Sequence, residues 1–249
     1  MLPNQIRKVL STIQKHQVRA LLMGGQACVL YGSAIFSRDV DFAILAEPQN
    51  LSRLQAALYE LEAEVIAVPP FEQRYLDEGL AVHFRCRHAE ADDLRVDVMS
   101  RMRGVADFEQ VWNRRTSAEL PDGTSVEVMG ISDLVQAKKT QRDKDWPMIA
   151  RLVDSDYKAN FESPTLRQLQ FWFAESRTPD LLVVLARRFP AEAEQAAARP
   201  AVDAALRDNP PEILAALRIE EDAEREADRL YWVPLRARLE ELRRARRKA

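Results

Sequence analysis

The chain has 249 residues, of which 47% are hydrophobic and 30% are charged, as is usual for a globular protein. Its 36 basic and 39 acidic side chains give a formal net charge of −3, which excludes a uniformly basic nucleic-acid coat. Two cysteines exclude a disulfide framework and a four-cysteine zinc site, and no apolar run approaches the roughly 18 residues of a membrane span. We therefore expect a cytoplasmic protein with reduced thiols and no membrane partner.

Glycine divides the chain, because all seven glycines lie between Gly24 and Gly130. The later part is rich in helix-forming Ala, Leu, Glu and Arg. Hydrophobic periodicity predicts helices over 3–17, 26–31 and 50–62, strands over 18–23, 39–45, 80–86, 93–99 and 125–129, and a helix starting near Ser132. The strands over 80–86 and 93–99 have the pattern of a hairpin. We expect an α+β fold, with the strands and their flanking helices over 1–130 and a mostly helical region over 131–249.

Two aspartates begin the strand predicted over 39–45. Side chains two residues apart in a strand share a face, so Asp39 and Asp41 point the same way while Val40 and Phe42 point into the core. Aspartate is disfavoured in strands, and two like charges on one face repel each other. A divalent cation would offset that repulsion, and Mg²⁺ prefers carboxylate and phosphate oxygens.

Asp97 shows the same pattern in another predicted strand, opposite the apolar Val96 and Val98. A third carboxylate from a neighbouring strand would allow two metal ions to be held together. Two other interpretations stay open: the aspartates are solvated surface residues, or Asp97 pairs with Arg95 on its own face. His83 lies on the polar face of a strand that neighbours Asp97, and it is a candidate acid/base group or phosphate contact for the site.

Gly24 and Gly25 lie between an apolar strand and a predicted helix. Gly24 precedes Asp39 by 15 residues. Glycine there allows backbone N–H groups to approach a phosphate closely. A Gly-Gly pair alone is a weak signal, and its combination with the three aspartates favours a metal–nucleotide site. The sequence contains neither a P-loop nor a Gly-x-Ser-x-Gly elbow.

Gly24-Gly25, Asp39-Val40-Asp41 and the Asp97 of RVDVM together resemble the nucleotidyltransferase superfamily related to DNA polymerase β. The small bacterial members are most similar, among them lincosamide-type antibiotic nucleotidyltransferases and AbiEii-type toxins. The resemblance implies the fold of that family for the first part of the chain, a catalytic domain over 1–130 built on a small mixed twisted sheet with flanking helices. It also implies that Asp39 and Asp41 bind two Mg²⁺ ions (Mn²⁺ being the alternative ion) and that Asp97 ligates a metal and acts as base.

A second matching stretch is ISDLVQAKKTQRDKDW, over 131–146. The resemblance implies that Lys138 and Lys139 face the triphosphate and that Arg142 supports the site. Spacings of four and three residues predict that Lys138, Arg142 and Asp145 lie along one helical face. A solvated helix face with internal ion pairs is the alternative.

The sequence departs from the family at two positions. Gln26 follows the glycine pair where many members have Ser, so the phosphate contacts are expected to come from the backbone or from Ser37. Ile35 stands where lincosamide-type relatives often have Arg, which is expected to weaken triphosphate binding. Neither change removes an expected metal ligand.

The resemblance implies transfer of a nucleoside monophosphate from an NTP to a hydroxyl of an unknown acceptor, with release of pyrophosphate. The acceptor class stays open among a small molecule, a tRNA and a protein. The alternative is a non-catalytic nucleotide- or partner-binding protein, such as a toxin–antitoxin component. The basic end over 235–248 is expected to be a solvated helix, with contact to RNA or a homo-oligomer or antitoxin interface as alternatives.

Overall fold

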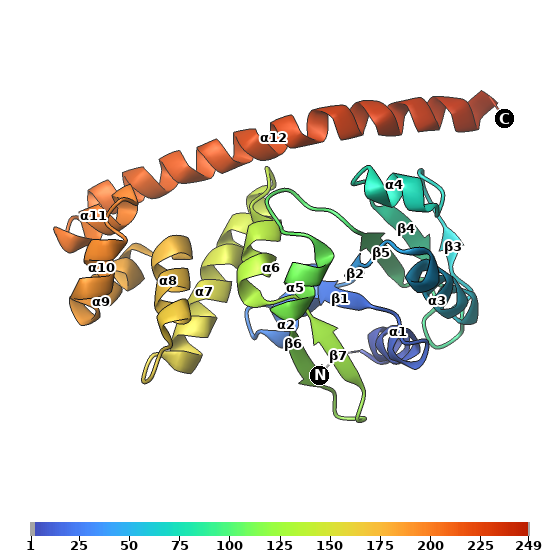
Figure 1. The fold of residues 1–249 in the computed structure, drawn as a ribbon, viewed down its shortest axis with the longest axis horizontal. Coiled ribbons are helices and arrows are strands. Elements are labelled where there is room, and N and C mark those ends of the chain that lie inside the picture. Colours follow the sequence, from blue (N-terminus) through green and yellow to red (C-terminus); the bar gives the residue numbers. More distant parts are fainter. Residues whose placement is uncertain (1–2, 249) are drawn as a thin grey trace. The chain divides into compact units, whose positions relative to one another are not determined.

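A computed structural model describes residues 3–248 (Figure 1). The described chain forms two compact units. Unit 1 contains residues 3–30, 35–137 and 231–248, and unit 2 contains residues 31–34 and 138–230. Within 3–248, no helix is both long enough and apolar enough to cross a membrane.

Unit 1 is built on a seven-stranded sheet with the strand order β3-β4-β5-β2-β1-β7-β6. The strands are β1 (Ala20–Met23), β2 (Val40–Ile44), β3 (Glu64–Val65), β4 (Val82–Arg85), β5 (Arg95–Met99), β6 (Thr116–Glu119) and β7 (Ser125–Val128). The pairs β2–β5 and β1–β7 are parallel and the other neighbours are antiparallel, so the sheet is mixed. The hairpin predicted from the sequence is confirmed as β4–β5.

Six helices accompany the sheet along the chain before unit 2. They are α1 (Asn4–Lys15), α2 (Gly24–Leu30), α3 (Pro48–Glu60), α4 (Gln73–Asp77), α5 (Phe108–Asn113) and α6 (Ile131–Lys138). Helix α1 buries the apolar stripe that its sequence shows, with Ile6, Val9 and Leu10 almost fully enclosed. Helices α1 and α3 pack side by side in Figure 1.

Alternation along the central strands separates the core from the site. In β5, Val96 and Val98 are fully buried on one face, and Arg95 and Asp97 belong to the other. In β2, Val40 and Phe42 are buried while Asp41 is partly exposed. Burial of each such aliphatic or aromatic side chain is worth about 1.5–3 kcal/mol, which fixes the register of these strands.

Unit 2 is helical. It contains the short 3-10 helix η1 (Asp143–Asp145) and the helices α7 (Trp146–Asn160), α8 (Leu166–Glu175), α9 (Pro179–Arg188), α10 (Pro190–Gln195) and α11 (Pro200–Leu206). Helix α12 (Pro210–Lys248) begins in unit 2 and ends in unit 1. Four of these helices begin at a proline, whose missing N–H costs nothing in a first turn. The predicted α+β class, with a mostly helical C-terminal region, is confirmed.

Two expectations about helices are wrong. The final helix does not start after Pro234, because α12 continues through that proline as one helix of 39 residues. A proline inside a helix removes one hydrogen bond, and a long helix can keep its remaining bonds on both sides. The helix that starts near Ser132 ends at Lys138, so Arg142 and Asp145 do not lie on its face.

Candidate active site

Three polar side chains form a row across neighbouring strands of unit 1. Asp97 of β5 is the register partner of Asp41 in parallel β2 and of His83 in antiparallel β4. Register partners project from the same face of a sheet, and neighbouring strands lie about 4.8 Å apart. Asp39 lies one residue before the start of β2 and two residues before Asp41. The structure thus brings Asp41 and Asp97 together as the strand pattern predicts, with His83 next to them.

The glycine pair packs against this row and its flanking loop. Gly24 has a positive φ of 64°, and a Cβ atom placed on it would overlap the carboxylate of Asp41. A Cβ atom on Gly25 would overlap the side chain of Ser37. These two positions therefore require glycine, because only an absent side chain permits both contacts.

Gln26 has a role that the sequence pattern did not reveal. Its side chain is buried, and Nε2 donates a hydrogen bond of 2.9 Å to the backbone oxygen of Ser37. The residue that departs from the family pattern thus fixes the loop that leads to Asp39. In the same loop Ile35 is fully exposed to solvent.

Asp97 is held by two basic neighbours. Arg95 donates from Nε to Oδ1 at 2.8 Å and from Nη2 to Oδ2 at 2.9 Å, and His83 Nδ1 lies 2.9 Å from Oδ1. Burial of Asp97 acts to raise its pKa, but the hydrogen bonds from His83 and Arg95 outweigh burial and hold the pKa below its ordinary value. The pairing of Asp97 with Arg95, left open by the sequence, is present.

Arg95 lies within electrostatic range of all three carboxylates. Its hydrogen bonds to Asp97 raise the pKa of the guanidinium, and the charges of Asp97, Asp39 and Asp41 raise it further. One cation thus already stands among the three predicted metal ligands. Residue spacing alone cannot distinguish this ion pair from metal ligation, because both need Asp97 on a polar face.

The predicted phosphate ligands Lys138, Lys139 and Arg142 all belong to unit 2. Lys138 Nζ lies 3.4 Å from Asp145 Oδ1, and Arg142 Nε donates to Asp145 Oδ2 at 2.7 Å. Lys139 Nζ donates to Glu175 at 2.8 Å. Each of the three is therefore paired with a carboxylate inside unit 2, and contact with a triphosphate stays a prediction.

No group of three or more His, Cys, Asp or Glu side chains forms a ready-made metal site in the part of the chain that the structure describes. The donors present are nonetheless suited to Mg²⁺, since Asp39, Asp41 and Asp97 offer only hard carboxylate oxygens. Asp41 and Asp97 are also adjacent in register. These three residues could hold a divalent cation if Asp97 became accessible to it.

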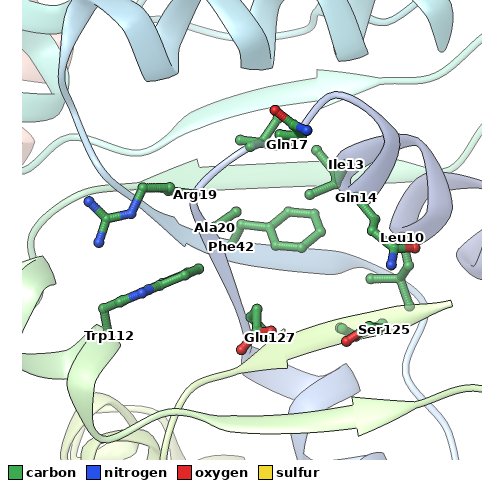
Figure 2. A pocket seen from close by; sticks show the side chains of 12 residues that line it. Leu10, Ile13, Gln14, Gln17, Arg19, Ala20, Phe42, Trp112, Ser125 and Glu127 are labelled. Carbon is green, nitrogen blue, oxygen red and sulfur yellow. The ribbon is translucent and has the colours of Figure 1, made fainter.

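A cavity of about 260 Å³ lies elsewhere in unit 1, near the residues labelled in Figure 2. Phe42 lines it and alternates with Asp41 along β2, so the cavity and the aspartate row belong to opposite faces of the sheet. At its edge, the Arg19 guanidinium lies over the Trp112 ring at 4.9 Å and also pairs with Glu109. None of the predicted site residues lines this cavity.

The cysteines do not supply a nucleophile. Cys28 and Cys86 are both fully buried, and neither forms a disulfide. Burial raises the pKa of Cys86 to about 11, so its thiol stays protonated at neutral pH.

No family model matches the chain, and no curated protein matches its sequence. Among solved structures, the antibiotic-resistance factor ANT(2″)-Ia in solution aligns with a TM-score of 0.37 and 11% identity, covering 77% of this chain and 92% of that chain. A crystal structure of ANT(2″)-Ia in complex with adenylyl-2″-tobramycin aligns with a TM-score of 0.37 and 13% identity, covering 75% and 95% respectively. At this level of similarity, a functional assignment depends on the site's own residues.

Proposed function

We propose that this protein is a Mg²⁺-dependent nucleotidyltransferase that moves a nucleoside monophosphate from an NTP to an acceptor hydroxyl and releases pyrophosphate. The observation that carries the proposal is the in-register placement of Asp41 and Asp97 on adjacent parallel strands. Asp39 stands two residues before Asp41, and Gly24 packs against the Asp41 carboxylate. Such carboxylates on neighbouring strands offer oxygen ligands to one or two divalent ions.

Each protein group has a definite part in the proposed reaction. Asp39, Asp41 and Asp97 would hold the Mg²⁺ ions, which when bound polarise the phosphate and lower the pKa of a bound hydroxyl. Gly24 and Gly25 let the Asp41 carboxylate and the Ser37 side chain pack against the backbone at the start of α2, because neither glycine carries a side chain. Asp97 can take the acceptor's proton only at an oxygen that Arg95 and His83 leave open.

The test is calorimetric titration of each of the four NTPs, with and without Mg²⁺, into the wild type and Asp39→Ala/Asp41→Ala. We expect Mg²⁺-dependent binding of one or two NTPs that the double variant loses. Asp77→Ala/Asp92→Ala is the matched control, because it removes two exposed aspartates and so changes the charge by the same amount. Loss of binding in this control as well would contradict a specific site.

Transfer itself is measured by pyrophosphate release from the NTP that binds, with candidate hydroxyl acceptors supplied in turn. We expect Asp41→Asn to abolish Mg²⁺-dependent release. Full activity in Asp41→Asn would refute the site assignment. Tight nucleotide binding with no release for any acceptor would instead favour the non-catalytic binding protein.

A further inference from the structure

The strongest feature that the proposed reaction does not use is the Arg95 guanidinium among the three carboxylates. We infer that Arg95 is a counter-cation for the carboxylate row, by which we mean Asp39, Asp41 and Asp97. We also infer that it competes with a divalent cation for Asp97. The inference rests on the proposed function, because it takes Asp39, Asp41 and Asp97 as the ligands of that cation. It adds a residue that controls when these ligands are available.

The hydrogen bonds to Asp97 leave little room for a second cation. A carboxylate offers about four lone-pair sites, two on each oxygen. Arg95 Nε and His83 Nδ1 both lie within hydrogen-bond distance of Oδ1, and Arg95 Nη2 takes one site on Oδ2. While Arg95 stays in place, it occupies one site on each oxygen of Asp97, and a cation at any remaining site would lie directly beside a full positive charge. Bidentate ligation by Asp97 requires the guanidinium to leave.

The two partners differ in their freedom to move. The Asp97 side chain is 12% exposed and lies on β5, which is paired on both sides, whereas the Arg95 side chain is 37% exposed. An arginine at that exposure can swing its guanidinium into solvent, where it is well hydrated. The exchange of one cation for another thus moves Arg95 and leaves the carboxylate where it is.

Electrostatics explains why a counter-cation is needed in the absence of metal. Three carboxylates that all act on one guanidinium also repel one another, and burial of Asp97 strengthens that repulsion. Arg95 neutralises part of this charge, since Asp97, Asp39 and Asp41 all stabilise its protonated form. The same positive charge repels an incoming divalent ion, so wild-type protein should bind such an ion weakly without nucleotide.

The test measures Mn²⁺ binding by calorimetry and electron paramagnetic resonance, with no nucleotide present. We expect Arg95→Gln to bind Mn²⁺ about tenfold more tightly than wild type, because the competing charge is gone while Asp97 remains. Arg95→Lys keeps the charge and should stay near the wild-type affinity. Arg95→Gln/Asp41→Asn should lose the gain, because the ion then has one ligand fewer.

Arg114→Gln is the matched control. Arg114 also donates two hydrogen bonds to one buried aspartate, Asp133, at 3.0 and 2.7 Å. The exposed fractions of that pair, 32% and 11%, are close to those of Arg95 and Asp97. The two Gln variants thus remove the same charge and each leaves a similar carboxylate without its arginine, so an equal gain in both would overturn the inference.

A second measurement needs no variant. In the wild type, the guanidinium NMR signal of Arg95 should shift when saturating Mg²⁺ is added, and that of Arg114 should not. Equal Mn²⁺ affinity in wild type and Arg95→Gln, or no binding in either, overturns the inference even if NTP transfer is found. Tighter Mn²⁺ binding in Arg95→Gln without any NTP binding leaves the inference standing and rejects the proposed function.

Discussion

Gly24 directly follows β1 and packs against the carboxylate of Asp41. Its backbone has a left-handed φ of 64°, which L side chains rarely adopt. The Asp41 carboxylate fills the space where a side chain would stand. A substitution here therefore combines backbone strain with displacement of a predicted metal ligand.

We expect Gly24→Ala to destabilise the protein by about 1–3 kcal/mol and to abolish Mg²⁺-dependent NTP binding. Urea unfolding and calorimetry measure the two effects. Gly123→Ala is the control, since Gly123 also has a positive φ, 82°, but a Cβ atom there meets nothing within 4 Å. Equal losses of stability in the two variants would show that contact with Asp41 contributes nothing beyond the strain.

Residue spacing predicted that the aspartates share a face, but it could not predict whether Arg95 or a metal ion binds them. A period of two in a strand places Asp41 and Asp97 on faces opposite their apolar neighbours, and the structure bears this out. The same period places Arg95 beside Asp97, so ion pairing and metal ligation give the same pattern. The hydrogen bond from Gln26 could not be predicted either, because its acceptor is a backbone oxygen in a loop.

At the scale of elements, α1 and α3 are joined by a charge cluster at their C-terminal ends. Glu60 accepts hydrogen bonds from Lys15 Nζ at 2.8 Å and Lys8 Nζ at 3.5 Å, and it lies 2.8 Å from His16 Nε2. Hydrogen bonds from Lys15 and then His16 lower the pKa of Glu60 to about 2. Glu60 thus holds the end of one helix to the end of the other.

This lowered pKa predicts a pH-dependent stability. A carboxyl group whose pKa falls on folding stabilises the native state above its unfolded pKa of about 4.3, and that contribution disappears as the pH falls toward about 2. We expect Glu60→Gln to cost about 1 kcal/mol at pH 7, near the upper limit for exposed pairs, and almost nothing at pH 2. Urea unfolding across this range measures the difference. Glu62→Gln, at an exposed position nearby, is the control and should show no such pH dependence. If Glu60→Gln lost the same free energy of unfolding at every pH, the charge cluster would not be the cause of that loss.

Elements with a strong apolar pattern were predicted well, and elements that depend on tertiary pairing were not. Strand β6 has the sequence TSAE and little buried surface, so only its pairing with β7 identifies it. Arg142 follows a helix that ends at Lys138, yet it still reaches Asp145 because the chain turns through η1. Continuous α12 was missed because Pro234 is a local signal for a break.

At the scale of the whole molecule, the chain leaves unit 1 and returns to it. After unit 2, the last part of α12 from Tyr231 onward belongs again to unit 1. There Arg238 Nε donates to Glu78 at 3.0 Å and its guanidinium lies 5.9 Å from the ring centroid of Tyr75. The Tyr231 hydroxyl would lie 3.3 Å from a Cβ atom on Gly79. Helix α4 and the turn after it are thus covered by a segment more than 150 residues later in the sequence.

We therefore expect a chain that ends at Leu230 to keep the helical core of unit 2 but to lose protection around α4. Hydrogen exchange detected by mass spectrometry should be faster over residues 73–79, because their covering contacts are gone, and unchanged in α8 and α9. A chain that ends at Leu242 is the control, since it keeps Tyr231 and Arg238 and loses only the residues from Arg243 onward. Equal exchange over 73–79 in the two shortened chains would mean that this segment of α12 does not stabilise unit 1. Faster exchange in α8 and α9 as well would mean that the two units depend on α12 together and unfold as one.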